Sequence, residues 1–179
     1  MKSVLIIGIG RFGRHLARKF VELGNEVMIV DIEEEKMSEI VSIVTTAQIG
    51  DCTNVDVLKS LGVRNFDICF VCIGDNFQAS LEITSLLKEL GAKHVVSKAN
   101  REIHAKFLLR NGADDVVYPE KDIAEKAAIR YSADHVFDYI ELTPEYSIAE
   151  IPPVSAWIGK TIAEISVRGK YQMSILATK

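Results

Sequence analysis

Three closely spaced glycines near the start of the chain form the first candidate site. Gly8, Gly10 and Gly13 follow the apolar run Val4 to Ile7 and precede a segment with helical periodicity. In a Gly-x-Gly-x-x-Gly pattern between a strand and a helix, the first glycine permits a tight turn and the second lets the backbone approach a pyrophosphate. The third allows the helix to pack closely on the strand. The N–H groups at the start of the helix would then face phosphates, so the pattern predicts a nucleotide-binding loop.

Two other residues of this loop, Arg11 and Phe12, lie at the predicted start of the helix. The Arg11 guanidinium can form a charge-assisted hydrogen bond with a terminal phosphate. A solvated surface arginine is the alternative.

Asp31 closes the second apolar run, 18 residues after Gly13. A carboxylate at this point of the fold can accept hydrogen bonds from both hydroxyls of an adenosine ribose. It would also repel a 2′-phosphate, so the sequence disfavours NADP.

Further polar residues follow later strand-like runs, at the edge of the sheet where ligands bind in such folds. Asp51 and Cys52 follow one run and Gly74 follows the next. Asp51 can accept a hydrogen bond from an adenine amino group, or it can cap the helix that begins near residue 54. The Lys98 ammonium can bind a phosphate group, or Lys98 is a lysine at the end of a strand with no role in ligand binding.

Glu120 opens a predicted helix, where an acidic residue also suits the helix dipole without any further role.

Cys69 and Cys72 form a C-x-x-C pair, but residues three apart on a strand point to opposite faces of the sheet. We therefore expect buried structural thiols in place of a redox or zinc site.

The hydrophobic pattern predicts the elements that position these residues. Between residues 1 and 134, six apolar runs alternate with helical segments. The runs cover residues 4–7, 26–30, 47–49, 67–73, 94–97 and 115–118, and the helices cover 14–23, 33–43, 54–61, 77–90, 101–111 and 123–131. Such alternation predicts an α/β fold, a Rossmann-like, doubly wound, parallel sheet of six strands.

The pattern changes after residue 134. Residues 136–142 and 146–151 are strand-like and close in sequence, and 173–177 form a further strand-like run. We expect residues 135–179 to begin a small C-terminal α/β subdomain that is incomplete in this chain.

Composition excludes several classes of protein. The formal net charge is −4, with no cluster of basic residues, so we expect no binding to nucleic acid. The apolar runs are far shorter than the roughly 20 residues of a membrane-spanning helix. The sparse cysteines and the lack of a signal-peptide pattern favour the cytoplasm.

Taken together, these segments resemble the RCK (KTN, or TrkA-N) domains of the regulatory subunits of Trk and Ktr potassium uptake systems, most closely the KtrA type. The resemblance runs over nearly the whole chain. It rests on Gly-Ile-Gly-Arg-Phe-Gly at 8–13, Val-Asp at 30–31, Gly-Asp at 50–51, Ser-Lys-Ala at 97–99 and Tyr-Pro-Glu-Lys-Asp at 118–122. The arginine of the glycine loop and residues 119–122 discriminate best, because many dinucleotide enzymes share the other segments.

The resemblance implies a cytoplasmic subunit that is peripheral to the inner face of the membrane through its partner. That partner would be a membrane-embedded potassium translocation subunit. The chain would form a homo-oligomer, either a dimer or a ring of dimers, and would respond to ATP, ADP or NAD(H).

The resemblance also implies roles for individual residues. The glycine loop and Arg11 would hold the phosphates with Lys98 beside them, and Asp31 would hold the ribose. Asp51 and Gly74 would lie at the base end of the cleft. Glu120 would help to bind Mg²⁺ or Ca²⁺ at a dimer interface near the nucleotide.

The glycine loop alone would also permit an NAD-dependent oxidoreductase, which is the alternative function. Such an enzyme needs a substrate domain that places a general acid or base beside the nicotinamide. The 45 residues after position 134 leave little room for one. We therefore expect a regulatory protein that is not an enzyme.

Overall fold

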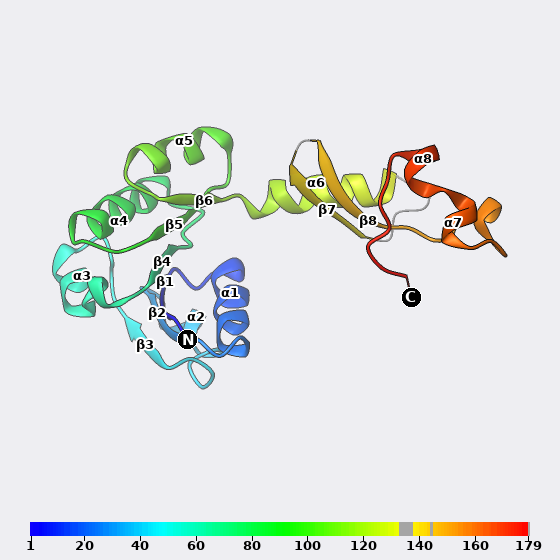
Figure 1. Cartoon of the computed structure of the whole chain (residues 1–179). Helices are drawn as coiled ribbons and strands as arrows, with labels where there is room; N and C mark the ends of the chain where they lie inside the picture. The colour runs from blue at the N-terminus through cyan, green and yellow to red at the C-terminus, as the bar shows by residue number, and fades with distance from the viewer. Residues whose placement is uncertain (133–137, 144, 179) are drawn as a thin grey trace. The chain divides into compact units, whose positions relative to one another are not determined.

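The computed structural model describes residues 1–132, 138–143 and 145–178. The chain forms two compact units, residues 1–122 and 123–179. A six-stranded parallel sheet forms the centre of the first unit, in the order β3-β2-β1-β4-β5-β6 (Figure 1). The strands are β1 (Ser3–Ile7), β2 (Glu26–Asp31), β3 (Thr46–Ile49), β4 (Ile68–Val71), β5 (Val95–Lys98) and β6 (Asp115–Val117). The predicted doubly wound α/β fold is confirmed.

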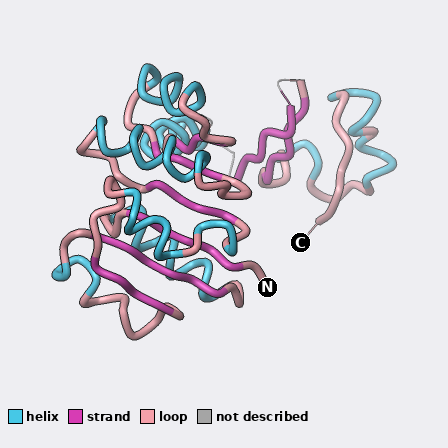
Figure 2. Tube along the Cα trace, turned by 90° about the vertical axis from the view of Figure 1, so that its left-hand side faces the viewer, coloured by secondary structure: helices cyan, strands magenta, loops and turns pink. Residues whose placement is uncertain are grey.

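Helices cover both faces of this sheet (Figure 2). The helices are α1 (Arg11–Glu22), α2 (Glu34–Met37), α3 (Val55–Leu61), α4 (Phe77–Glu89) and α5 (Glu102–Arg110), followed by α6 (Pro119–Ser132). Buried residues of α1 and α2 pack on one face, and those of α3 and α4 pack on the other. The helix α5 packs beside α4.

The central strands are mostly apolar because both faces of the sheet are buried there. In β1, Leu5 and Ile7 belong to the cluster under α3 and α4, whereas Val4 and Ile6 belong to the cluster under α1. Each of these side chains is at most 2% exposed. Burying a side chain of this size contributes roughly 1.5 to 3 kcal/mol, so the central strands account for much of the core.

The two cysteines of the C-x-x-C pair lie on opposite faces, as the strand geometry predicts. Cys69 belongs to the cluster with Leu87 of α4, and Cys72 belongs to the cluster with Ala17 of α1. Both are free thiols, and burial raises the pKa of each to about 12. They therefore act as small core residues.

Three helices differ from the predicted ranges by more than one residue at an end. The segment predicted as a helix over 33–43 forms only the four residues of α2 and then continues as turns. Its β-branched residues after position 40 lower helix propensity. The helix α1 already starts at Arg11, inside the glycine loop, and α6 starts at Pro119, where the missing N–H of proline is tolerated.

The second unit contains the antiparallel hairpin β7 (Asp138–Thr143) and β8 (Tyr146–Glu150). These strands match the two predicted runs, although residues 136 and 137 of the first run lie outside the described residues. A 3₁₀ turn (Ser155–Trp157), α7 (Ile162–Ile165) and α8 (Val167–Tyr171) follow. The strand expected over 173–177 is wrong: these residues have no regular structure, since none of the described residues pairs with them as a strand.

None of the helices in the described parts of the chain has the length and hydrophobicity needed to span a membrane.

Asp67 ties the start of β1 to β4 and gives a prediction about pH. Its Oδ2 accepts a hydrogen bond from Ser3 N at 3.0 Å, and its Oδ1 lies 2.9 Å from Lys93 Nζ. The Ser3 N–H and then the Lys93 ammonium lower the pKa of Asp67 from 3.8 to about 2. A lowered pKa in the folded state stabilises the fold above the unfolded value and loses that effect as the pH falls through the folded value.

We therefore expect Asp67→Asn to lower the melting temperature near neutral pH. The difference from the wild type should shrink as the pH falls from about 3.8 to about 2. Asp56→Asn is the matched control, because the Asp56 carboxylate is 81% exposed. Thermal unfolding across this pH range tests the prediction, and a difference that grows in acid would contradict it.

Candidate functional site

A pocket of about 280 Å³ lies at the carboxyl ends of β1, β2, β3 and β4. This is the point where the strand order of the sheet reverses, at which α/β folds of this type bind ligands. Its volume is near the lower end of the range for small-molecule sites. It brings together six of the residues predicted from the sequence: Gly8, Gly10, Asp31, Asp51, Cys52 and Gly74.

The three glycines of the loop have different structural roles. Gly8 has a φ of +93°, and its N–H donates to Val30 O at 2.9 Å. A Cβ at Gly13 would lie 2.2 Å from Gly8 O, so only glycine lets α1 approach the loop this closely. A Cβ at Gly10 would meet no atom within 4 Å. Gly10 therefore leaves open space at the N-terminus of α1, where backbone N–H groups can receive an anion.

The Asp31 carboxylate holds the glycine loop in place. Oδ2 accepts from Ile9 N at 2.6 Å, and Oδ1 accepts from Glu33 N at 2.9 Å. The residue is only 8% exposed, yet it lines the pocket. A carboxylate has about four acceptor positions, so two remain for the hydroxyls of a ligand.

Asp51 forms a local turn in front of α3. Its Oδ1 accepts from Thr53 N at 2.9 Å and from Thr53 Oγ1 at 2.7 Å. The Thr53 hydroxyl and then its N–H hold the pKa of Asp51 below the ordinary value. The alternative that Asp51 caps this helix is wrong, because Asn54 is the cap and accepts from Asp56 N at 2.9 Å.

The loop after β4 forms the opposite wall of the pocket. The carbonyl of Gly74 accepts from Asn100 Nδ2 at 2.8 Å, which fixes this loop to the end of β5. Asn76 caps α4 by accepting from Ala79 N at 3.0 Å. Cys52 also lines the pocket, but burial and then the charges of Asp51 and Asp31 raise the pKa of its thiol to about 12.

Beside the glycine loop, four residues form what we call the Lys98 cluster: Lys98, Glu120, Arg11 and Phe12. Lys98 Nζ lies 3.0 Å from Glu120 Oε1 and 5.9 Å from the centre of the Phe12 ring. The Lys98 hydrogen bond is the largest factor that lowers the pKa of Glu120, and the Arg11 charge adds to it. A Cβ at Gly74 would lie 3.5 Å from Lys98 Nζ, so the cluster adjoins the pocket wall without lining the pocket.

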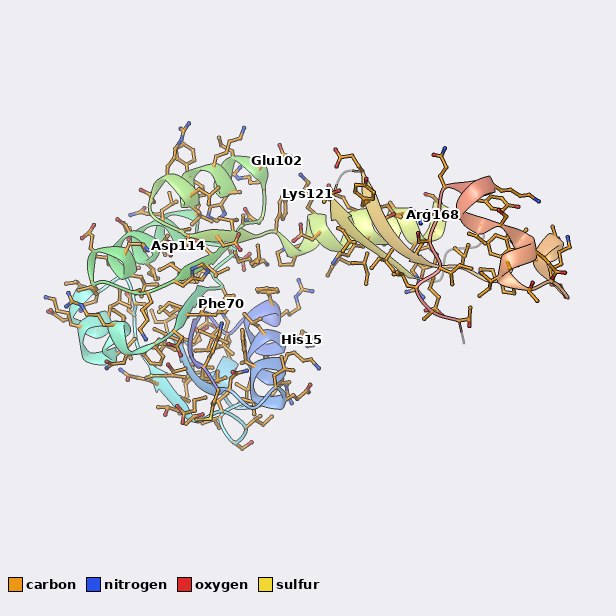
Figure 3. The ribbon with its side chains drawn as sticks, in the orientation of Figure 1. His15, Phe70, Glu102, Asp114, Lys121 and Arg168 are labelled. Atoms are coloured by element: carbon orange, nitrogen blue, oxygen red, sulfur yellow. The ribbon has the colours of Figure 1, made fainter. Side chains whose placement is uncertain are left out.

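Two ion pairs fix the start of α6: Lys98–Glu120 of the Lys98 cluster, and a second pair outside it. Lys121, the next residue after Glu120, lies 3.1 Å from Glu102 Oε1 on α5 (Figure 3). The first turn of α6 is therefore attached to β5 and to α5 through charged pairs.

Glu120 does not make a metal site by itself. Across residues 1–132, 138–143 and 145–178 there is no group of three His, Cys, Asp or Glu side chains that could hold a metal ion. A cation at Glu120 would therefore need further ligands from phosphate oxygens or from a second copy of the chain.

Among the charged residues of the pocket that sequence reasoning missed, Glu33 and Lys36 form an ion pair. They belong to a charged segment with helical periodicity, which is typical of a solvated helix face. Their spacing of three residues, which allows an ion pair within one helical turn, was the one feature of the sequence that pointed to them. Asp75 and Thr53 also line the pocket through local turns after β4 and β3.

Residues 4–119 match the TrkA-N domain. The chain belongs to the TrkA-N domain family. It is 43% identical over 178 residues to the Ktr system potassium uptake protein C of Bacillus subtilis (strain 168), a match that covers 99% of this chain and 80% of that protein.

Two solved structures extend the comparison for this TrkA-N family member. The Kef C-terminal domain of Shewanella denitrificans in its AMP-bound form is 26% identical, with a TM-score of 0.63 over 73% of this chain and 79% of that one. The GsuK channel bound to NAD has a TM-score of 0.69 at 20% identity, over 93% of this chain and 31% of that one, which supports the fold.

Proposed function

We propose that this chain is the nucleotide-sensing regulatory subunit of a Ktr-type potassium uptake system and has no enzymatic activity. Its similarity to a Ktr system protein over nearly its whole length supports this role. The observation that carries the proposal is the pocket in which Asp31 fixes an open glycine loop at the N-terminus of α1. A solved structure of similar fold binds AMP, which supports an adenosine nucleotide as the ligand.

In this proposal each part of a nucleotide has its own residues. Backbone N–H groups from Gly8 to Gly13, with Arg11 beside them, would hold the phosphates of ATP, ADP or NAD(H). Asp31 would accept from the ribose hydroxyls. The base end of the site would be formed by Asp51, Cys52 and Gly74.

The Lys98 cluster provides a physical means to distinguish ATP from ADP. Lys98 is paired with Glu120 at 3.0 Å, and the cluster adjoins the glycine loop. A terminal phosphate would compete with Glu120 for the Lys98 ammonium and would leave Glu120 available to Mg²⁺ or Ca²⁺ across a dimer interface. A ligand can shift a conformational equilibrium only if it binds the two states with different affinity, and this competition supplies such a difference.

The proposed subunit is cytoplasmic and acts as a homo-oligomer on a membrane-embedded potassium translocation subunit. We place the boundary of its nucleotide-binding domain at residue 134, after the end of α6, and assign residues 135–179 to the start of the C-terminal subdomain. The helix α6 begins at the Lys98 cluster, so a change in the Lys98–Glu120 pair would act directly on the segment that leads into this subdomain.

Small-angle scattering with ATP and with ADP, each with Mg²⁺, tests the proposed role. We expect a dimer or larger assembly, with scattering that differs between the two nucleotides. Glu120→Gln should reduce the dependence of the ATP form on Mg²⁺. Glu82→Gln neutralises an acid on α4 that does not line the pocket, and it should behave as the wild type.

A monomer at micromolar concentration with identical scattering in ATP and ADP would contradict the proposal. Sustained oxidation of NADH in the presence of carbonyl compounds would instead favour the oxidoreductase alternative.

A further inference from the structure

The ion pair between Glu33 and Lys36 lies at the adenosine end of the pocket and has no role in the function proposed above. Lys36 Nζ lies 2.6 Å from Glu33 Oε1, and both residues line the pocket. Glu33 is also attached to Asp31, because its N–H donates to Asp31 Oδ1 at 2.9 Å. The Lys36 side chain is 41% exposed, so the pair lies at the mouth of the pocket, within reach of a ligand.

The charges around this end of the pocket are mostly negative. Among its lining residues, Lys36 is the one cationic side chain, beside the carboxylates Asp31, Glu33, Asp51 and Asp75. The Glu33 hydrogen bond, followed by the charges of Asp31 and Asp75, raises the pKa of Lys36. Acidic groups from both walls of the pocket therefore already act on the Lys36 ammonium.

This arrangement bears on how the pocket treats the ribose 2′ position. In sheets of this order, a carboxylate at the end of the second strand bonds the ribose 2′-hydroxyl, whereas a nearby cation accommodates a 2′-phosphate. The pocket has both kinds of group, Asp31 and Lys36. Whether the pocket accepts a 2′-phosphate therefore depends on whether the Lys36 ammonium is free to bind it. In this structure the ammonium is paired with Glu33.

We infer that the Glu33–Lys36 pair sets the specificity of the pocket for nucleotides with a free ribose 2′-hydroxyl, because Glu33 holds the Lys36 ammonium away from a 2′-phosphate. The inference rests on the proposed nucleotide binding and narrows its ligand class to adenosine nucleotides that are unmodified at this position. Asp31 alone would repel a 2′-phosphate, and the ion pair with Glu33 keeps Lys36 from compensating that repulsion.

Calorimetric titration with AMP and with adenosine 2′,5′-bisphosphate tests the inference, because the two ligands differ only in the 2′-phosphate. In the wild type the bisphosphate should bind more weakly. The dissociation constant of the bisphosphate divided by that of AMP should be about tenfold smaller in Glu33→Gln than in the wild type. This is the effect of one charge-assisted hydrogen bond. The affinity for AMP itself should change by less than about threefold, because the Glu33 carboxylate pairs with Lys36 and the substitution leaves the backbone N–H that bonds Asp31 in place.

Two control variants separate release of Lys36 from a simple loss of negative charge. The double variant Glu33→Gln/Lys36→Met should lose the gain in bisphosphate binding, since no ammonium remains to receive the 2′-phosphate. Glu34→Gln removes the same charge one residue later, outside the pocket lining, and should leave the ratio as in the wild type.

The inference is overturned if the ratio in Glu33→Gln equals that of the wild type, or if the gain persists in the double variant. Failure of the wild type to bind AMP, ADP or NADH at all would contradict the proposed function instead.

Discussion

Gly13→Ala should destabilise the first unit by about 3 kcal/mol and abolish nucleotide binding. The added Cβ would lie 2.2 Å from Gly8 O, a backbone atom that cannot move without displacing the loop. Alanine raises helix propensity by about 1 kcal/mol, which is too little to offset this clash. Denaturant unfolding measures the stability, and titration with ADP measures the binding.

The matched control is Gly10→Ala, in the same loop. Here the added Cβ meets no protein atom within 4 Å, so stability should fall by about 1 kcal/mol or less, the cost of losing glycine at a helix N-cap. ADP affinity should nevertheless fall by at least about tenfold, because the methyl group occupies the space in which the phosphates would lie. Equal stabilities of the two variants would show that the loop does not have the geometry described above.

Asp31→Ala is the second change for which we expect a large effect. It leaves the N–H groups of Ile9 and Glu33 without their acceptor at a residue that is only 8% exposed. Loss of these two charge-assisted hydrogen bonds should lower the free energy of unfolding by about 3 kcal/mol. The affinity for ADP should fall by about 100-fold, since the ribose acceptor is lost and the glycine loop is released at the same time.

Asp31→Asn separates the two roles of this carboxylate. The amide oxygen can still accept one of the two N–H groups, so this variant should be more stable than Asp31→Ala. Its affinity for ADP should remain well below that of the wild type, because the charged acceptor is gone. A melting temperature and an ADP affinity that both match the wild type in Asp31→Ala would remove this residue from the site.

The fold followed largely from local patterns in the sequence. Strands such as Val4 to Ile7 are buried on both faces, so their continuous apolar runs identified them. The predicted helix over 33–43 and the predicted strand over 173–177 were the failures. Hydrophobic periodicity and β propensity predict secondary structure poorly where a short segment depends on tertiary contacts or on a neighbouring strand for its stability.

The candidate site was predictable in part. The glycine spacing and the position of Asp31 indicated which strand ends carry it, because parallel strands end at one edge of the sheet. The second role of Asp31, as acceptor for the N–H groups of Ile9 and Glu33, was not visible in the sequence. The Glu33–Lys36 pair was not visible either, since only the three-dimensional structure shows that a charged segment turns toward the pocket.

The most direct test of the account is to locate the bound nucleotide on the chain. Addition of ADP to isotope-labelled protein, followed by amide NMR spectra, reports on each backbone N–H group separately. We expect the largest shifts at Gly10, Arg11 and Phe12, with smaller shifts at Glu33 and Gly74. Gly10→Ala should need at least about tenfold more ADP to give shifts of the same size. Shifts confined to residues 138–178, or no shifts at saturating ADP, would contradict the central claim that the glycine loop is the nucleotide site.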